Sequence, residues 1–134
     1  MFFIKILFIF FIYLNISYSY ASNIKNSAVV FMYHKFGVSK YPSTSVRIDQ
    51  LENHLKEFSK EKYSVKSIEF IIDTIINDGD LPNNTIGISI DDADRSFYEV
   101  GWPKFKEKNI PVTLFVNTST IHENNKNYLN WNQI

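Results

Sequence analysis

The sequence predicts an α/β protein in which the strands of a parallel sheet are joined by crossover helices. Short apolar stretches rich in β-branched and aromatic residues alternate along the chain with stretches whose apolar residues recur every three or four positions. A predicted helix separates each predicted strand from the next. This order favours a parallel sheet, because parallel neighbours need a long crossover between them.

The first half of the pattern contains strand 28–33, helix 47–62, a short strand at 63–66 and helix 67–76. The loop 35–46 joins the first strand to the first helix, since it contains glycine, proline and several hydroxyl residues. The first helix is amphipathic, with apolar residues at Ile48, Leu51, Leu55 and Phe58. The second helix begins after Ser67, whose hydroxyl can cap it.

The second half contains strand 85–90, a helical stretch at 96–108 and strand 111–116. Gly101 and Pro103 interrupt the helical stretch and are expected to bend or split it. Five asparagines make 117–130 a predicted loop, namely Asn117, Asn124, Asn125, Asn127 and Asn130. Residues 131–134 resemble the start of another element, so we expect the chain to be a truncated part of a larger domain.

The first 21 residues have the pattern of a secretory signal peptide. Lys5 precedes an uninterrupted apolar run from Ile6 to Leu14, and Ser19 and Ala21 place small residues at a cleavage site. The run is about half of the roughly 20 residues that a spanning helix needs. We therefore expect a secreted or periplasmic protein, which meets a membrane only if the signal segment stays uncleaved.

Charge and composition exclude several function classes. The 14 basic and 14 acidic residues leave no basic excess for nucleic acid. Only four glycines are present and none forms a phosphate-binding loop, so a nucleotide partner is not expected. With no cysteine, the chain contains no disulfide, thiolate metal site or thiol nucleophile.

Asp91 and Asp92 are the strongest candidates for chemistry, because they directly follow the predicted strand 85–90. Active sites of parallel α/β folds gather at the carboxyl ends of strands. Two adjacent carboxylates at such a place are costly unless a cation or hydrogen bonds compensate them. One carboxylate could bind a metal while the other faces a water molecule, although capping of the next helix explains an Asp equally well.

The motif Gly87-Ile88-Ser89-Ile90-Asp91-Asp92-Ala93, followed by Pro103 and by 109–116, resembles the polysaccharide deacetylase family of NodB-homology carbohydrate esterases. That family has Thr-Phe-Asp-Asp-Gly after a strand. The stretch Val30-Phe31-Met32-Tyr33-His34 is similar to the Met-Tyr-His strand of the branch that acts on poly-N-acetylglucosamine. The resemblance covers most of the chain after the signal peptide.

The resemblance implies the N-terminal portion of a deformed (β/α) barrel, spanning 22–134 with its core motifs in 84–134. It implies a metal-dependent hydrolase that removes acetyl groups from an extracellular N-acetylated polysaccharide. Carried over by position, Asp91 is the general base and Asp92 a ligand of a divalent metal, with zinc expected. A metal of this kind lowers the pKa of bound water and polarises the carbonyl.

This chain departs from the family pattern in two ways. Ala93 replaces a glycine, and Asp94 adds a third carboxylate that could raise neighbouring pKa values or recruit a second cation. The family's His-[Ser/Thr]-x-x-His motif is also absent from the chain, whose three histidines are His34, His54 and His122. Because catalytic metals normally have three protein ligands, the chain as given is not expected to be active.

Other interpretations remain open. His34 could contact substrate, although an ordinary hydrogen-bonded histidine at a strand end is favoured, and Trp102 and Trp131 are expected in the core. The chain could be a secreted glycan-binding module without catalysis, or a fragment. The stretch from Asp92 to Ser96 also resembles the haloacid dehalogenase-like phosphatase motif, with Asp92 as nucleophile, Asp94 as acid/base and magnesium as cofactor.

Overall fold

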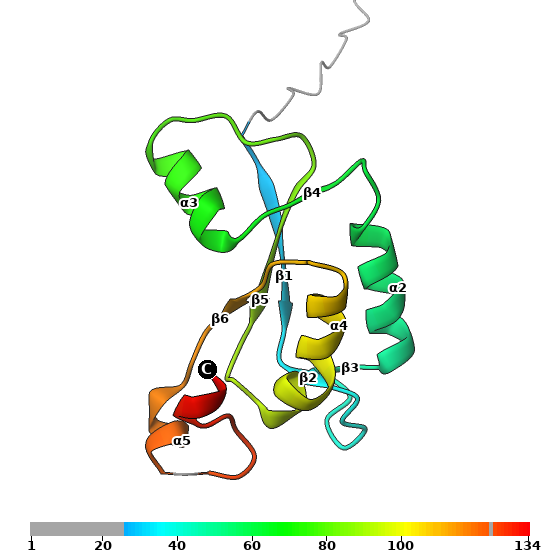
Figure 1. The fold of residues 1–134 in the computed structure, drawn as a ribbon, viewed down its shortest axis with the longest axis vertical. Helices are drawn as coiled ribbons and strands as arrows, with labels where there is room; N and C mark the ends of the chain where they lie inside the picture. Colours follow the sequence, from blue (N-terminus) through cyan, green and yellow to red (C-terminus); the bar gives the residue numbers. More distant parts are fainter. Residues whose placement is uncertain (1–25, 124) are drawn as a thin grey trace, which may run out of the picture.

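The computed structural model describes residues 26–123 and 125–134, so the predicted signal peptide at 1–21 lies outside the described residues. The predicted alternation of strands and helices is confirmed (Figure 1). The elements are, in order, β1 (Ala28–Tyr33), β2 (Lys35–Phe36), β3 (Ser45–Val46), α2 (Ile48–Phe58), β4 (Ser64–Val65), α3 (Ile68–Ile76), β5 (Thr85–Ile90), the π-helix η1 (Phe97–Gly101), α4 (Trp102–Glu107), β6 (Thr113–Leu114), α5 (Thr118–His122) and the 3₁₀ helix η2 (Trp131–Gln133).

The sheet is built around β5, and every strand pair in the described residues is parallel, as predicted. Strand β1 pairs with β5 along its whole length, from Ala28 opposite Thr85 to Tyr33 opposite Ile90. On the other side, β4 pairs with the beginning of β5 and β6 with its end. Strands β2 and β3 form a separate ladder of two residues each.

All six residues of β5 are buried, which explains why this strand is nearly continuous in apolar and small residues. Gly87 lies where α3 approaches the sheet. A Cβ atom at this position would lie 2.9 Å from Cδ1 of Ile71 and 3.3 Å from Cγ1 of Ile68. The glycine therefore leaves room for the Ile71 and Ile68 side chains of α3 to pack closely on β5.

Helices α2 and α4 lie side by side on one side of the strands, and α3 lies on the other (Figure 1). The period of apolar residues in α2 places Leu51, Leu55 and Phe58 in the core, as predicted. Helix α3 begins where the sequence indicates, because the Oγ atom of Ser67 accepts a hydrogen bond from the backbone N–H of Phe70 at 3.1 Å.

The expected division of the helical stretch 96–108 is confirmed, because it consists of the π-helix η1 followed by α4, with Pro103 in the first turn of α4. The structure corrects three other details of the sequence analysis. The predicted loop 35–46 contains the short strands β2 and β3 at its two ends. The predicted loop 117–130 contains the short helix α5. Trp102 and Trp131 are not core residues, since 38% and 52% of their surfaces are exposed.

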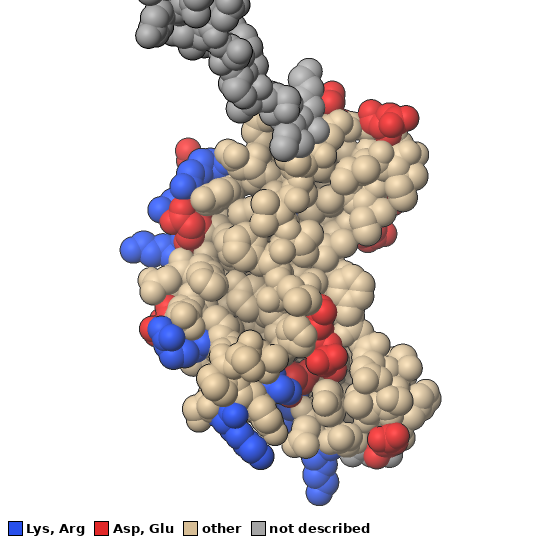
Figure 2. Space-filling view, turned by 180° about the vertical axis from the view of Figure 1, so that it is seen from behind, with Lys and Arg blue, Asp and Glu red and all other residues tan. Residues whose placement is uncertain are grey.

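Strand β1 forms an edge of the described sheet, and its apolar side chains are open to solvent. Val29 is 60% exposed, Val30 48% and Met32 61%, and β1 contains no charged residue. On the surface seen from behind, basic and acidic side chains gather over the flank that contains α2, while the flank of α3 shows a few acidic side chains on an otherwise uncharged surface (Figure 2). The described part of the chain thus leaves apolar surface uncovered.

Candidate active site

The carboxyl ends of three strands meet at one edge of the sheet, and Asp91 is the first residue beyond the central one. Its backbone N–H donates to the carbonyl oxygen of Tyr33 at 2.8 Å, and the N–H of Phe115 donates to Ile90 at 2.8 Å. His34, Asp91 and Phe115 therefore follow directly after β1, β5 and the paired end of β6. This is where parallel α/β proteins place their active sites.

The Oδ1 atom of Asp91 is buried and has no hydrogen-bond partner among the described residues. A buried carboxylate oxygen without a donor loses its hydration and gains nothing in exchange. Such an atom is rare in a native structure and calls for a ligand, a water molecule or a cation. The capping role that could equally explain Asp91 or Asp92 is not observed for either residue, because the side chain that accepts from a backbone N–H at the start of the following helix is that of Asp94.

Asp92 and Ala93 adopt left-handed backbone conformations, with φ angles of 68° and 54°. For residues other than glycine this conformation costs about 1–2 kcal/mol each. Asp92 is exposed, whereas Ala93 is fully buried. Two consecutive residues in this region turn the chain sharply after β5, so Asp91 and Asp92 project from different parts of one strained turn.

A later segment of the chain holds this turn in place. The N–H of Leu129 donates to the carbonyl oxygen of Ala93 at 2.9 Å, and the N–H of Arg95 donates to that of Asn127, also at 2.9 Å. Asp94 and Tyr128 form an isolated antiparallel bridge between the same two segments. The backbone from 127 to 129 therefore fixes the turn by hydrogen bonds on both sides of Asp94.

Asp94 does not act as the free third carboxylate that the sequence suggested. Its Oδ2 atom forms an ion pair with Nζ of Lys35, and its Oδ1 atom accepts hydrogen bonds from the N–H of Ser96 at 3.0 Å and from the Ser96 hydroxyl at 2.5 Å. Burial raises the pKa of the Asp94 carboxyl, but the hydrogen bonds from Lys35 and Ser96 outweigh burial and lower this pKa below its ordinary value. The negative charge of the Asp94 carboxylate is thus already compensated by Lys35.

The histidines lie apart from one another. His34 follows β1 and is partly buried. It lies near Asp91 at the carboxyl edge of the sheet. Nδ1 of His54 is hydrogen-bonded to the Tyr33 hydroxyl at 2.8 Å, and His122 packs edge-on against Trp131 with ring centroids 5.7 Å apart. Within the described ranges, no three His, Asp or Glu side chains come together as a metal site. Asp92 alone does not fit a tightly bound catalytic metal, which normally has three protein ligands.

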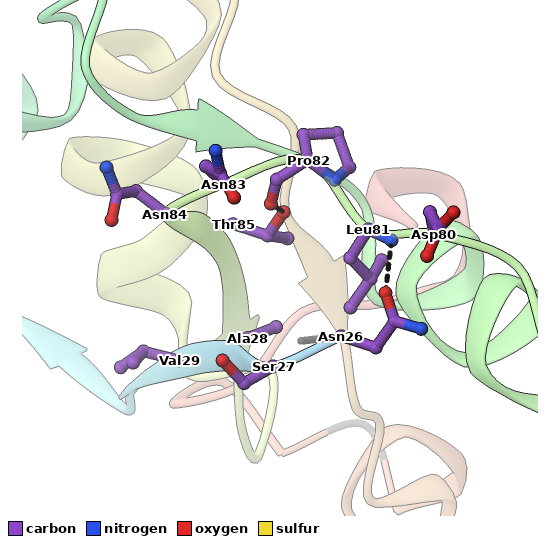
Figure 3. A pocket seen from close by; sticks show the side chains of 10 residues that line it. All are labelled: Asn26, Ser27, Ala28, Val29, Asp80, Leu81, Pro82, Asn83, Asn84 and Thr85. Atoms are coloured by element: carbon purple, nitrogen blue, oxygen red, sulfur yellow. Dashed lines mark hydrogen bonds between the residues drawn. The ribbon is translucent and has the colours of Figure 1, made fainter. Parts of the chain in front are cut away.

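A cavity of about 780 Å³ lies at the opposite end of the sheet. It is lined by the amino ends of β1 and β5 and by the segment that leads into β5 (Figure 3). Its wall is held by a hydrogen bond from the N–H of Leu81 to Oδ1 of Asn26 at 2.9 Å. The cavity contains no counterpart of the Asp91–Asp92 pair, so we place the candidate active site at the carboxyl end of the sheet.

The chain has the fold of polysaccharide deacetylases, as comparison with solved structures demonstrates. It resembles a de-N-acetylase from Aggregatibacter actinomycetemcomitans with a TM-score of 0.69 and 21% identity, over 79% of this chain and 48% of that one. For the deacetylase PplD from Streptococcus pyogenes the TM-score is 0.70 and the identity 22%, over 82% and 50%. For IcaB from Ammonifex degensii the values are 0.57 and 22%, over 70% and 40%.

These likenesses confirm the fold that the sequence motifs implied, an α/β part of a NodB-type barrel. The chain spans about half the length of the solved structures it matches. No protein-family model matches the sequence, and no curated protein matches it. No helix within 26–123 or 125–134 is long and apolar enough to cross a membrane.

Proposed function

We propose that this chain is the Asp-Asp half of a deacetylase that hydrolyses N-acetyl groups of an extracellular polysaccharide. The observation that carries the proposal is the buried, partnerless Oδ1 atom of Asp91, placed directly after the central strand of a deacetylase-type fold. The predicted signal peptide at 1–21 supports a secreted or periplasmic location. The motif around Asp91 supports the substrate class, an N-acetylated polysaccharide.

In this proposal Asp91 acts as general base. Its carboxylate accepts a proton from a water molecule whose oxygen attacks the amide carbonyl carbon. The carbon–nitrogen bond then breaks, the nitrogen leaves as an amine with the transferred proton, and acetate is released. The Oδ1 atom of Asp91 is not engaged by any described protein donor and is therefore free to accept this proton. The Oδ1 atom of Asp94 is not free, because it already accepts hydrogen bonds from Ser96.

Asp92 is proposed as one ligand of a divalent cation, with zinc as the first choice. The described residues do not supply the other ligands, so we assign no step of the reaction to a metal. His34 is proposed to contact the substrate, because it follows the strand that pairs with β5 beside Asp91.

Among the residues that the structure describes, no cluster of metal ligands is formed, and this favours one alternative, a secreted glycan-binding module without catalysis. A phosphatase that uses Asp92 and Asp94 receives less support. Asp94 is engaged by Lys35 and Ser96 and is therefore poorly placed to exchange a proton with substrate. Two of the solved structures that share the fold are a de-N-acetylase and a deacetylase.

The test is an assay of acetate release from an N-acetylglucosamine oligomer, with and without added zinc, on the protein in its full reading frame. Deacetylase function requires release by the wild type, its loss in Asp91→Asn, and normal release by Asp73→Asn, which changes an exposed aspartate of α3. Binding of the oligomer that survives in Asp91→Asn, without release by any variant, would establish the binding module instead.

A further inference from the structure

Two adjacent residues of β2 both bind the turn that follows the Asp pair. Nζ of Lys35 forms the ion pair with Asp94, and the backbone N–H of Phe36 donates to the Ser96 hydroxyl oxygen at 3.0 Å. Because Ser96 also donates to Asp94, these four residues form a closed ring of polar contacts. The ring is largely shielded from water, since 19% of the Lys35 side chain and 10% of the Asp94 side chain are exposed.

The Lys35 ammonium also contacts two aromatic rings from other loops. It lies 5.4 Å from the ring centroid of Tyr41 and 5.8 Å from that of Tyr128. Both distances are within the range of a cation–π interaction. Tyr41 belongs to the loop between β2 and β3, and Tyr128 to the segment that hydrogen-bonds to the turn. One partly buried cation therefore joins three loops at the carboxyl edge of the sheet.

This arrangement explains how a strained turn keeps one conformation. Asp92 and Ala93 are both left-handed, and neither is a glycine. Residues in this region persist only where their surroundings fix them. On the carboxyl side of the turn, Asp94 is the first residue with fixed side-chain contacts, and Lys35 is its only ionic partner among the described residues.

We propose that Lys35 is a positioning residue for the Asp91–Asp92 turn. Lys35 acts on the Asp91–Asp92 pair through its ion pair with Asp94 and not by direct contact with either carboxylate. The position of Asp94 sets the direction in which the turn leaves β5. The inference rests on the proposed function for its kinetic consequence and on the geometry alone for its structural consequence. Removal of the cation leaves Asp94 buried without its counter-ion and releases the turn.

The experiment compares Lys35→Met, Lys35→Arg and Lys104→Met with the wild type in the full reading frame. Lys104→Met is the matched control, because Lys104 forms an ion pair of 2.6 Å with Glu52 between α4 and α2, away from the turn. Deacetylation gives kcat and KM, and amide hydrogen exchange at Leu129 and Arg95 reports on the turn without any need for activity.

We expect Lys35→Met to lower kcat about tenfold or more with KM changed less than about twofold, since small misplacements of a catalytic group are costly. Lys35→Arg should restore most of kcat, and exchange at Leu129 should be faster in Lys35→Met only. Normal exchange and normal kcat in Lys35→Met would overturn the inference. If the wild type releases no acetate, the proposed function fails, and the exchange rates alone still decide the role of Lys35.

Discussion

The backbone N–H of Asp91 donates to the carbonyl oxygen of Tyr33 at 2.8 Å, so the last hydrogen bond between β5 and β1 is made by the first residue of the Asp pair. Asp91 is thereby anchored through its backbone while its Oδ1 atom has no partner among the described residues. A residue held in this way can present a carboxylate without moving.

Replacement of Asp91 by Asn should abolish catalysis without a loss of stability. Asn is nearly the same size and removes a charge that the fold does not compensate at Oδ1. We expect kcat to fall by about 10²-fold or more, as for the loss of a general base. Thermal unfolding should occur at the same temperature or higher. A variant that melts well below the wild type would show that the carboxylate serves the structure.

Replacement of Ala93 by Gly should stabilise the protein slightly. The change removes strain of about 1–2 kcal/mol at a φ of 54°. It also loses a buried methyl group worth about 0.8 kcal/mol. The expected balance in the free energy of unfolding is a gain of about 0.2–1.2 kcal/mol, from the same two contributions. Urea denaturation measures it, and Ala28→Gly, at an ordinary strand position of β1, should instead destabilise.

Replacement of Tyr33 by Phe should remove the hydrogen bond to His54 and cost about 1 kcal/mol at neutral pH. Burial raises the pKa of Tyr33 from 10.0 to about 12. An unfolded tyrosine ionises near pH 10, so stability that depends on the neutral phenol is complete below pH 10 and is lost between pH 10 and about 12.

Denaturation curves of wild type and Tyr33→Phe at pH 8 and pH 11 measure this difference. The stability of the wild type relative to the variant should decrease at the higher pH. Tyr98→Phe is the control, since Tyr98 is 42% exposed. An advantage of the wild type that grows at pH 11 would contradict the assignment.

Replacement of Gly101 by Ala should destabilise the protein although alanine favours helices. A Cβ atom at this position would lie 3.0 Å from Cδ1 and Cε1 of the Phe36 ring, and Phe36 is only 1% exposed. A rigid buried ring cannot move aside, so we expect a cost of about 1–3 kcal/mol. A double-mutant cycle with Phe36→Leu should recover part of it. Additive effects of the two changes would place the strain elsewhere.

Much of the fold could be predicted from the sequence because its signals are local. The bounds of β1 and β5 follow from short apolar runs that end in polar residues, and α3 begins at a hydroxyl cap. The position of Asp91 at the end of β5 was likewise readable, since only the neighbouring residues decide it. Motif order then led to the deacetylase fold, which the solved structures confirm.

The contacts that organise the candidate site could not be predicted in this way. Lys35 and Asp94 are 59 residues apart, and nothing near either residue indicates the other. The sequence therefore suggested a free carboxylate at Asp94, where the structure has an ion pair. Helix α5 is not indicated by the sequence, because asparagines dominate its surroundings. The predicted core position of Trp131 is wrong, and the sequence does not show this because the exposure of Trp131 depends on what η2 packs against.

The central position of β5 also determines when this chain can fold. Ala28 pairs with Thr85, so β1 cannot join the sheet until a loop that contains α2, β4 and α3 has closed. Contacts so distant in sequence make folding slow compared with that of helical proteins. During synthesis the uncharged β1 emerges long before its partner, and in that interval it is free to pair with strands of other chains. A chaperone that holds the nascent chain until residue 90 has emerged would therefore raise the yield more than one that acts on the finished protein.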